Sequence, residues 1–279
     1  MQGTIFQILV LVTHGNMVLS GQPVASFYPQ HSAFKFDEFV KFVDLERNGS
    51  RWSEKPFAKD PDDWLAKLKG QRCSGLRVER VSTDKKDLSD RMSVAFIGGG
   101  GRWLIEAVCP RGSEYWEPKW EIGDRNRPDQ RIWRVTYGRI AQNQKASTTN
   151  FPSIEGLSSE MSSTLQDAIS FSKKHKLDGF GKAFQSGYSA LKADSEPELN
   201  GIAPRGQLPL PASRLLAASQ AAWVFGGMGS WNDLGFEGDD QKQYEAISDR
   251  LFRLINSSLV ATVNLSYKRA EKSWWKFWQ

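Results

Sequence analysis

The spacing of apolar residues changes partway along the chain, from every second position to every third or fourth. Between residues 76 and 140, short segments alternate apolar and polar side chains, which predicts strands with one buried and one solvated face. The alternating apolar residues of the three clearest segments are Trp103, Ile105, Ala107, Trp116, Trp120, Ile122, Trp133, Val135 and Tyr137. We therefore expect an antiparallel meander with its tryptophans gathered on one face.

A hairpin is expected at the start of this sheet. Residues 91–97 lead through four consecutive glycines, residues 98–101, into the strand at 102–108. Glycine allows the positive φ of a tight turn, and it also allows a ligand to approach the backbone closely. The simpler interpretation is a flexible hairpin tip.

Two helices are predicted before the sheet. The first covers residues 34–46, where apolar side chains follow the helical spacing i, i+3, i+4 and i+7. In the second, residues 60–69, Asp60 can cap the N-terminus and Pro61 suits the first helical position. These helices could cover the tryptophan-bearing face.

The longest apolar run near the N-terminus covers residues 5–12. It is shorter than the roughly 18 residues that a membrane span needs, and no basic segment precedes it as in a signal peptide. We interpret it as a buried strand, or as residues upstream of a true start at Met17. Integral membrane insertion is not expected.

Strand signals end near residue 140, and the polar residues 141–152 suggest a linker. Helical spacing then recurs in residues 157–169, 180–191, 212–225 and from residue 239 onward. The predicted fold class is α+β: an N-terminal antiparallel meander sheet with two packed helices, followed by an all-helical C-terminal half. We predict an α+β domain at residues 1–146 and a helical domain at residues 147–279.

Charge and cysteine content narrow the function classes. The net charge is +5, and its excess of cations is spread over residues 1–146, too thinly to indicate a surface for nucleic acid. Cys73 and Cys109 have neither CxxC spacing nor a nearby histidine, so neither a zinc site nor a disulfide framework is indicated. The sequence leaves open whether Cys73 and Cys109 form one disulfide with each other. We expect a soluble, cytoplasmic protein.

The glycine-rich loop, residues 226–240, is the most distinctive stretch of the sequence. Its glycines do not match GxGxxG, and a helix rather than a strand is expected before it, which disfavours phosphate binding. The candidate binding residues here are Trp231, Asn232, Asp233 and Glu237. Its carboxylates could hold a hard cation, but the EF-hand ligand order is absent. The simpler interpretation is structural, with Trp231 anchoring the loop and the acidic residues favouring the next helix N-terminus.

No catalytic residues can be named from the sequence. The three histidines, His14, His31 and His175, have no telling neighbours, and neither GxSxG nor HExxH occurs. We predict no cofactor and no metal site, and the missing catalytic motifs favour a protein that is not an enzyme.

Two aromatic and basic stretches could contact a partner. Residues 268–279 combine four basic residues with Trp274, Trp275 and Trp278, which suits a partner groove or membrane interface, or packing back on the sheet. The arginines of residues 125–139 lie among aromatic residues, as on a surface for single-stranded nucleic acid, but the alternation assigns those rings to the core.

The sequence hypothesis is a non-enzymatic protein-interaction module of unknown specificity. Its exposed aromatic candidates are Trp231 and the tryptophans of residues 268–279. The alternative is a ligand- or metal-binding enzyme with a pocket between sheet and helices near residues 226–240, and the third candidate is a nucleic-acid-binding protein. Oligomeric state is left open.

Overall fold

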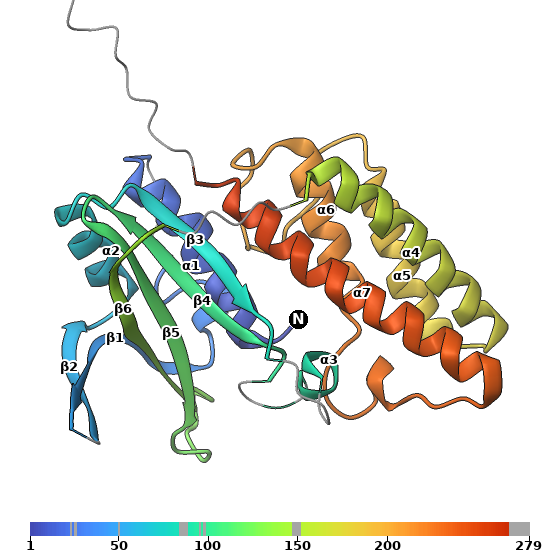
Figure 1. The fold of residues 1–279 in the computed structure, drawn as a ribbon, viewed down its shortest axis with the longest axis horizontal. Helices are drawn as coiled ribbons and strands as arrows, with labels where there is room; N and C mark the ends of the chain where they lie inside the picture. Colours follow the sequence, from blue (N-terminus) through green and yellow to red (C-terminus); the bar gives the residue numbers. More distant parts are fainter. Residues whose placement is uncertain are drawn as a thin grey trace, which may run out of the picture.

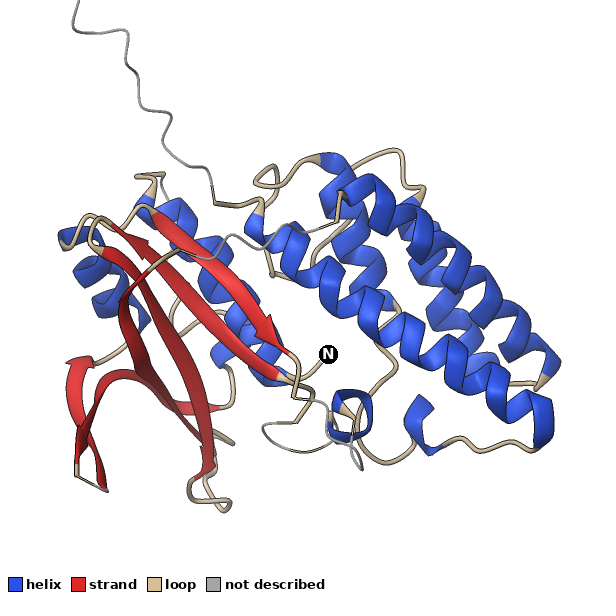
Figure 2. Cartoon of the chain, viewed as in Figure 1, coloured by secondary structure: helices blue, strands red, loops and turns tan. Residues whose placement is uncertain are grey.

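The computed structural model describes residues 1–22, 24, 27–49, 51–83, 89–94, 96, 99–146 and 152–267. Figure 1 shows a twisted sheet with helices α1 (Gly3–Leu19) and α2 (Pro61–Gly70) against it and a helical bundle at its side. Figure 2 shows that the strands lie in one part of the molecule and the long helices of the bundle in the other. The predicted α+β class with an all-helical C-terminal half is confirmed.

The sheet has six strands among the described residues. They are β1 (Asp37–Asn48), β2 (Arg51–Ala58), β3 (Gly75–Val81), β4 (Arg102–Cys109), β5 (Gly112–Ile122) and β6 (Trp133–Gln144), in the order β2-β1-β6-β5-β4-β3. The consecutive strands β3 to β6 pair antiparallel and form the expected meander. The β1–β2 hairpin extends it through a parallel pairing of β1 with β6.

The helix predicted over residues 34–46 is wrong, because residues 37–48 form the strand β1. Val40 and Phe42 point into the core at alternate positions, opposite Val135 and Tyr137 of β6. A short run rich in β-branched and aromatic residues fits both periods, and the hydrogen bonds offered by β6 and β2 favour the strand.

The hairpin predicted from residues 91–97 is also wrong. Residues 90–93 form the short helix α3 (Asp90–Ser93), and β4 pairs instead with β3, with Val81 opposite Arg102. Gly99 packs so closely on this helix that a Cβ atom there would lie 1.8 Å from the carbonyl oxygen of Ser93. Gly99 therefore serves a close backbone approach rather than the tip of a hairpin.

The apolar N-terminal residues form the helix α1, not the expected buried strand. Side chains on every side of its middle turns are buried. A helix that is apolar all round needs packing partners on opposite sides, and α1 contacts β3 and β4 of the sheet as well as α7 (Gly238–Asn264) of the bundle. Within the described ranges, no helix combines the length and the apolar character that crossing a membrane requires.

Aromatic residues fill the space between the sheet and α2. Trp64 of α2 stacks on Phe42 with 4.4 Å between ring centroids, and Trp116 meets both rings edge-on. Asp60 accepts a hydrogen bond from the backbone N–H of Asp63 at 2.8 Å, which confirms the predicted cap. Of the tryptophans assigned to the core, Trp103 and Trp116 are buried, and Trp120 and Trp133 are half-buried against it.

The bundle consists of α4 (Ile154–Lys174), α5 (Asp178–Leu191), α6 (Leu210–Ala221) and α7. Each of the four helical stretches expected in the second half corresponds to one of these helices. Leu157, Met161 and Leu165 recur on the buried side of α4, as the spacing predicts.

Two asparagines close the free edge of the sheet at β3. The carboxamide of Asn16 on α1 accepts from the Leu76 N–H at 2.6 Å and donates to the Leu76 carbonyl at 3.0 Å. Asn264 at the end of α7 pairs in the same way with Val78, at 2.7 and 3.0 Å. The backbone groups that the edge strand leaves open at Leu76 and Val78 are thus satisfied by α1 and α7.

Cys73 and Cys109 form a disulfide, the pairing that the sequence left open. Cys73 follows α2 and Cys109 ends β4, so the bond joins the connection after α2 to the sheet. Ser74 follows Cys73 directly, and its hydroxyl lies 3.0 Å from the hydroxyl of Tyr267, which follows α7.

We expect Asn264→Ala to lower the free energy of unfolding by roughly 1 to 3 kcal/mol, because it leaves the N–H and C=O groups of Val78 without partners. Urea unfolding measures the change. Asn126→Ala, in an exposed turn, is the control and should stay within roughly 0.5 kcal/mol of the parent. Equal effects of the two substitutions would contradict the role given to Asn264.

Asp37 predicts a distinctive pH dependence. Gln7 of α1 donates to Asp37 at 2.7 Å, and burial raises the pKa of Asp37 to about 7. Between about pH 4 and pH 7 the unfolded chain has therefore lost this proton while the folded protein keeps it, so Asp37 makes stability fall as pH rises through that range. The loss is at most about 4 kcal/mol, at about 1.4 kcal/mol per pKa unit.

Asp37→Asn should remove this contribution. As pH rises from 4 to 7, the unfolding free energy of the variant should increase relative to that of the parent. Above pH 7 the difference between the two proteins should stay constant. Burial lowers the pKa of His14 to about 4, so this residue also makes stability depend on pH. Because His14 is present in both proteins, its contribution cancels in the difference between variant and parent. A difference that does not change with pH would show that Asp37 ionises normally in the fold.

Candidate functional site

The glycine-rich loop connects α6 to α7 and folds into a compact turn. The backbone N–H of Ser230 donates to the Gly227 carbonyl, and that of Trp231 donates to the Val224 carbonyl, both at 3.1 Å. The Ser230 hydroxyl donates to the Gly226 carbonyl at 3.1 Å. Gly229 has a φ of 82°, which a residue with a side chain rarely adopts. Its own hydrogen bonds therefore fix the conformation of the loop.

Trp231 anchors the loop, and the expectation that its ring is exposed is wrong. The ring is fully buried, and its indole N–H donates to the Ser248 hydroxyl of α7 at 2.7 Å. The Tyr244 hydroxyl donates to the Trp231 carbonyl at 2.6 Å, and burial raises the pKa of this tyrosine. Trp231 thus attaches the loop to α7 by its side chain and its backbone.

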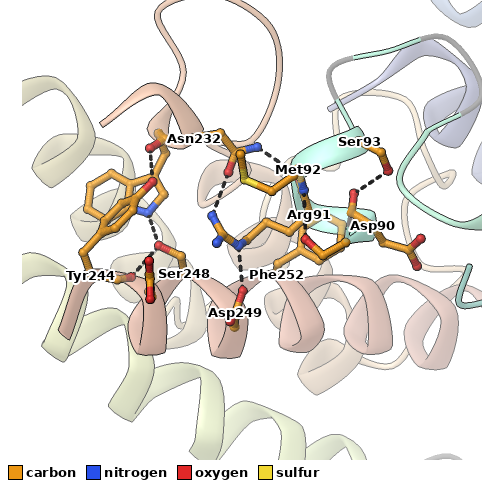
Figure 3. Close-up of polar contacts among 12 residues, drawn as sticks. Asp90, Arg91, Met92, Ser93, Asn232, Tyr244, Ser248, Asp249 and Phe252 are labelled. Atoms are coloured by element: carbon orange, nitrogen blue, oxygen red, sulfur yellow. Dashed lines mark hydrogen bonds and ion pairs between the residues drawn. The ribbon is translucent and has the colours of Figure 1, made fainter. Parts of the chain in front are cut away.

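Asn232 joins the loop to α3. Its side-chain amide donates to the Arg91 carbonyl at 2.8 Å, and its oxygen accepts from the Arg91 guanidinium at 3.2 Å. The same guanidinium donates to Asp249 of α7 at 2.7 Å. Figure 3 shows Arg91 between Asn232 and Asp249, with Met92 beside the asparagine. Arg91 of α3 therefore bonds to the loop and to α7, both of which are distant from it in sequence.

The neighbouring residue Asp90 connects α3 to the sheet. This buried carboxylate accepts from Arg80 of β3 and from the Thr83 hydroxyl, each at 2.7 Å. Adjacent residues of α3 therefore hold the two parts of the molecule, Asp90 the sheet and Arg91 the bundle.

The acidic candidates of the loop have structural positions. Asp233 accepts from the Ser230 N–H at 3.1 Å and completes a capping box at the short 3-10 helix η2 (Trp231–Asp233). Glu237 is exposed and precedes α7 without a side-chain cap. The part of the chain that the structure describes contains no cluster of three or more His, Cys, Asp or Glu residues suited to a metal ion.

Met228 is the most exposed large apolar residue of the loop. The residue is 101% exposed. An open pocket of about 560 Å³ borders the loop beside it, lined by Met1, Leu177, Asp178, Gly179, Phe180, Ala183, Trp223, Val224, Phe225, Gly229 and Ser230. Most of this lining is apolar, and α5 and the residues after α6 supply its aromatic rings.

The aromatic walls of this pocket are held by other rings behind them. Phe180 meets Trp231 edge-on at 5.2 Å, and Phe225 meets Phe252 at 5.2 Å. The indole N–H of Trp223 already donates to the Phe225 carbonyl at 2.7 Å. These contacts support the aromatic walls from behind, as in preformed binding sites.

The remaining predicted candidates do not join this site. Trp274, Trp275 and Trp278 lie outside the described residues. Among the arginines considered for nucleic acid, Arg134 pairs with Glu38 at 2.8 Å, and buried Arg139 pairs with Glu114 at 2.9 Å.

Two of the three histidines, His14 and His31, lie together, with 5.2 Å between their ring centroids. His14 is buried in α1, where burial and the neighbouring His31 lower its pKa to about 4. His31 lies 3.0 Å from the Gly201 carbonyl. His175 packs on Phe171 and Phe236 at the end of α4.

No family model, curated protein or solved structure matches this chain.

We expect Asn232→Ala to loosen the contact between the loop and α3, at a cost of roughly 1 to 3 kcal/mol for the two lost hydrogen bonds. Hydrogen exchange should increase at the amides of α3 and of the loop and stay unchanged in α2. Asn232→Asp keeps the acceptor for Arg91 and should give a smaller increase. If the amides of both variants exchange at the same rates as those of the parent, Asn232 does not hold the loop to α3.

Proposed function

We propose that this protein is a non-enzymatic protein-interaction module that binds its partner through the glycine-rich loop and the pocket beside it. The observation that carries the proposal is the complete exposure of Met228 on a loop whose base is tightly held. Methionine is common at protein-binding surfaces, because its flexible thioether adapts to different apolar partners. Binding to a loop with a fixed backbone also costs less conformational entropy.

The neighbouring pocket supports the same proposal. It is open and apolar and has aromatic walls, which suits an anchoring side chain of a partner protein. Met92 of α3, 43% exposed, is a further candidate contact because its neighbour Arg91 is bonded to the loop. Trp274, Trp275 and Trp278 stay predicted contacts of a partner.

Affinity capture with the full-length chain tests the role of Met228. Met228→Asp should lose captured proteins at least about tenfold, because a carboxylate at the contact must be desolvated. The control Ile140→Asp changes an apolar residue of β6 that is 37% exposed. It should retain the same proteins as the parent, and the melting temperatures of both variants should be checked. Identical captured proteins for Met228→Asp and the parent would exclude the loop tip as the contact.

A ligand-binding protein or enzyme is the second candidate, because the pocket lies against residues 223–230. A thermal-shift panel of divalent metals and nucleotides tests it, since a ligand at 100 times its Kd adds about 2.7 kcal/mol of apparent stability. Ala183→Trp, which fills the pocket, should abolish any shift that arises there. Nothing in the site favours the third candidate, nucleic-acid binding.

A cytoplasmic location stays a prediction. Disulfides such as Cys73–Cys109 persist mainly in oxidising compartments, so the bond does not support that prediction. Trapping free thiols with an alkylating reagent in intact source cells would distinguish a reducing cytoplasmic location from an oxidising compartment.

A further inference from the structure

The methionines differ widely in their access to solvent. Met228 is 101% exposed and Met92 is 43% exposed, whereas Met161 in the core of the bundle is 0% exposed. Oxidation of a methionine thioether requires that the oxidant reach the sulfur atom, so exposure sets the order of reactivity. Met228 is therefore the methionine most open to oxidants.

The surroundings of Met228 leave its sulfur uncovered. A Cβ atom placed on Gly226, Gly227 or Gly229 would meet no other atom within 4 Å. The hydrogen bonds that fix the turn are made by Ser230, Trp231 and Asp233, and none of them involves the side chain of Met228. A change at this side chain therefore leaves the fold of the loop in place.

We propose that Met228 is a site of reversible oxidation by hydroperoxides. The sulfur lone pair attacks one peroxide oxygen, the O–O bond breaks, and the products are the methionine sulfoxide and water, or an alcohol from an organic hydroperoxide. The sulfur loses two electrons and the peroxide gains them. A dithiol-dependent reductase reverses the change, giving the thioether, water and a disulfide of the reductant.

The sulfoxide changes the surface that the partner meets. It replaces an apolar, flexible contact by a polar one at the loop tip. This consequence rests on the proposed docking role of Met228, whereas the oxidation itself does not. The same oxidation at Met161 would place a polar group in the core of the bundle and destabilise it.

Treatment of the purified full-length chain with hydrogen peroxide tests the site. Peptide mass spectrometry over time should find Met228 oxidised at least about tenfold faster than Met161 and faster than Met92. The paired methionine sulfoxide reductases MsrA and MsrB, which act on the two sulfoxide epimers, should restore Met228. Oxidation of Met92 or Met161 at the same rate as Met228, or failure of both reductases to restore Met228, would overturn the proposal.

Partner capture then tests the consequence. Oxidised parent protein should lose its partner, whereas oxidised Met228→Leu, which keeps an apolar side chain without sulfur, should retain it. If both oxidised proteins lose the partner equally, oxidation acts at another residue, and the proposed effect of Met228 oxidation on partner binding is overturned. If Met228→Asp captures the same proteins as the parent before oxidation, the proposed function fails instead, while the measured oxidation rates still decide the modification site.

Discussion

The open backbone edge of β3 is the constraint on which the arrangement of the molecule depends. An edge strand presents unpaired N–H and C=O groups, which need partners when they are buried. Asn16 and Asn264 supply them, since a carboxamide has a donor and an acceptor and can pair with a backbone residue as a neighbouring strand would. These two residues lie on α1 and α7, so the pairing fixes helices from distant parts of the chain against one strand.

The position of α7 in turn determines where the candidate site is built. Its earlier turns carry Ser248 and Asp249, which hold Trp231 and Arg91. The short helix α3 connects this region back to the sheet through Asp90. The glycine-rich loop is therefore fixed by residues from both parts of the molecule, while its tip remains free to make contacts.

Sequence patterns predicted the elements whose signal is local. Alternation identified β4, β5 and β6, and Asp60 with Pro61 marked the start of α2. The patterns failed in β1, where the helical and the strand periods fit equally well. They also failed in α1, which is apolar on all sides and therefore has no apolar stripe to detect. For the candidate site, the sequence singled out residues 226–240 but gave Trp231 the wrong exposure, and it missed Arg91.

The sequence by itself determined the α+β class, the helical second half and the unusual composition of residues 226–240, because each is encoded in neighbouring residues. The tertiary structure decided that β3 rather than residues 91–97 pairs with β4, that Trp231 is buried, and that Met228 is presented to solvent. Arg91 and Asn232 are separated by 141 positions, and no local periodicity records such a contact. Burial and pairing between distant segments exist only once the chain has packed.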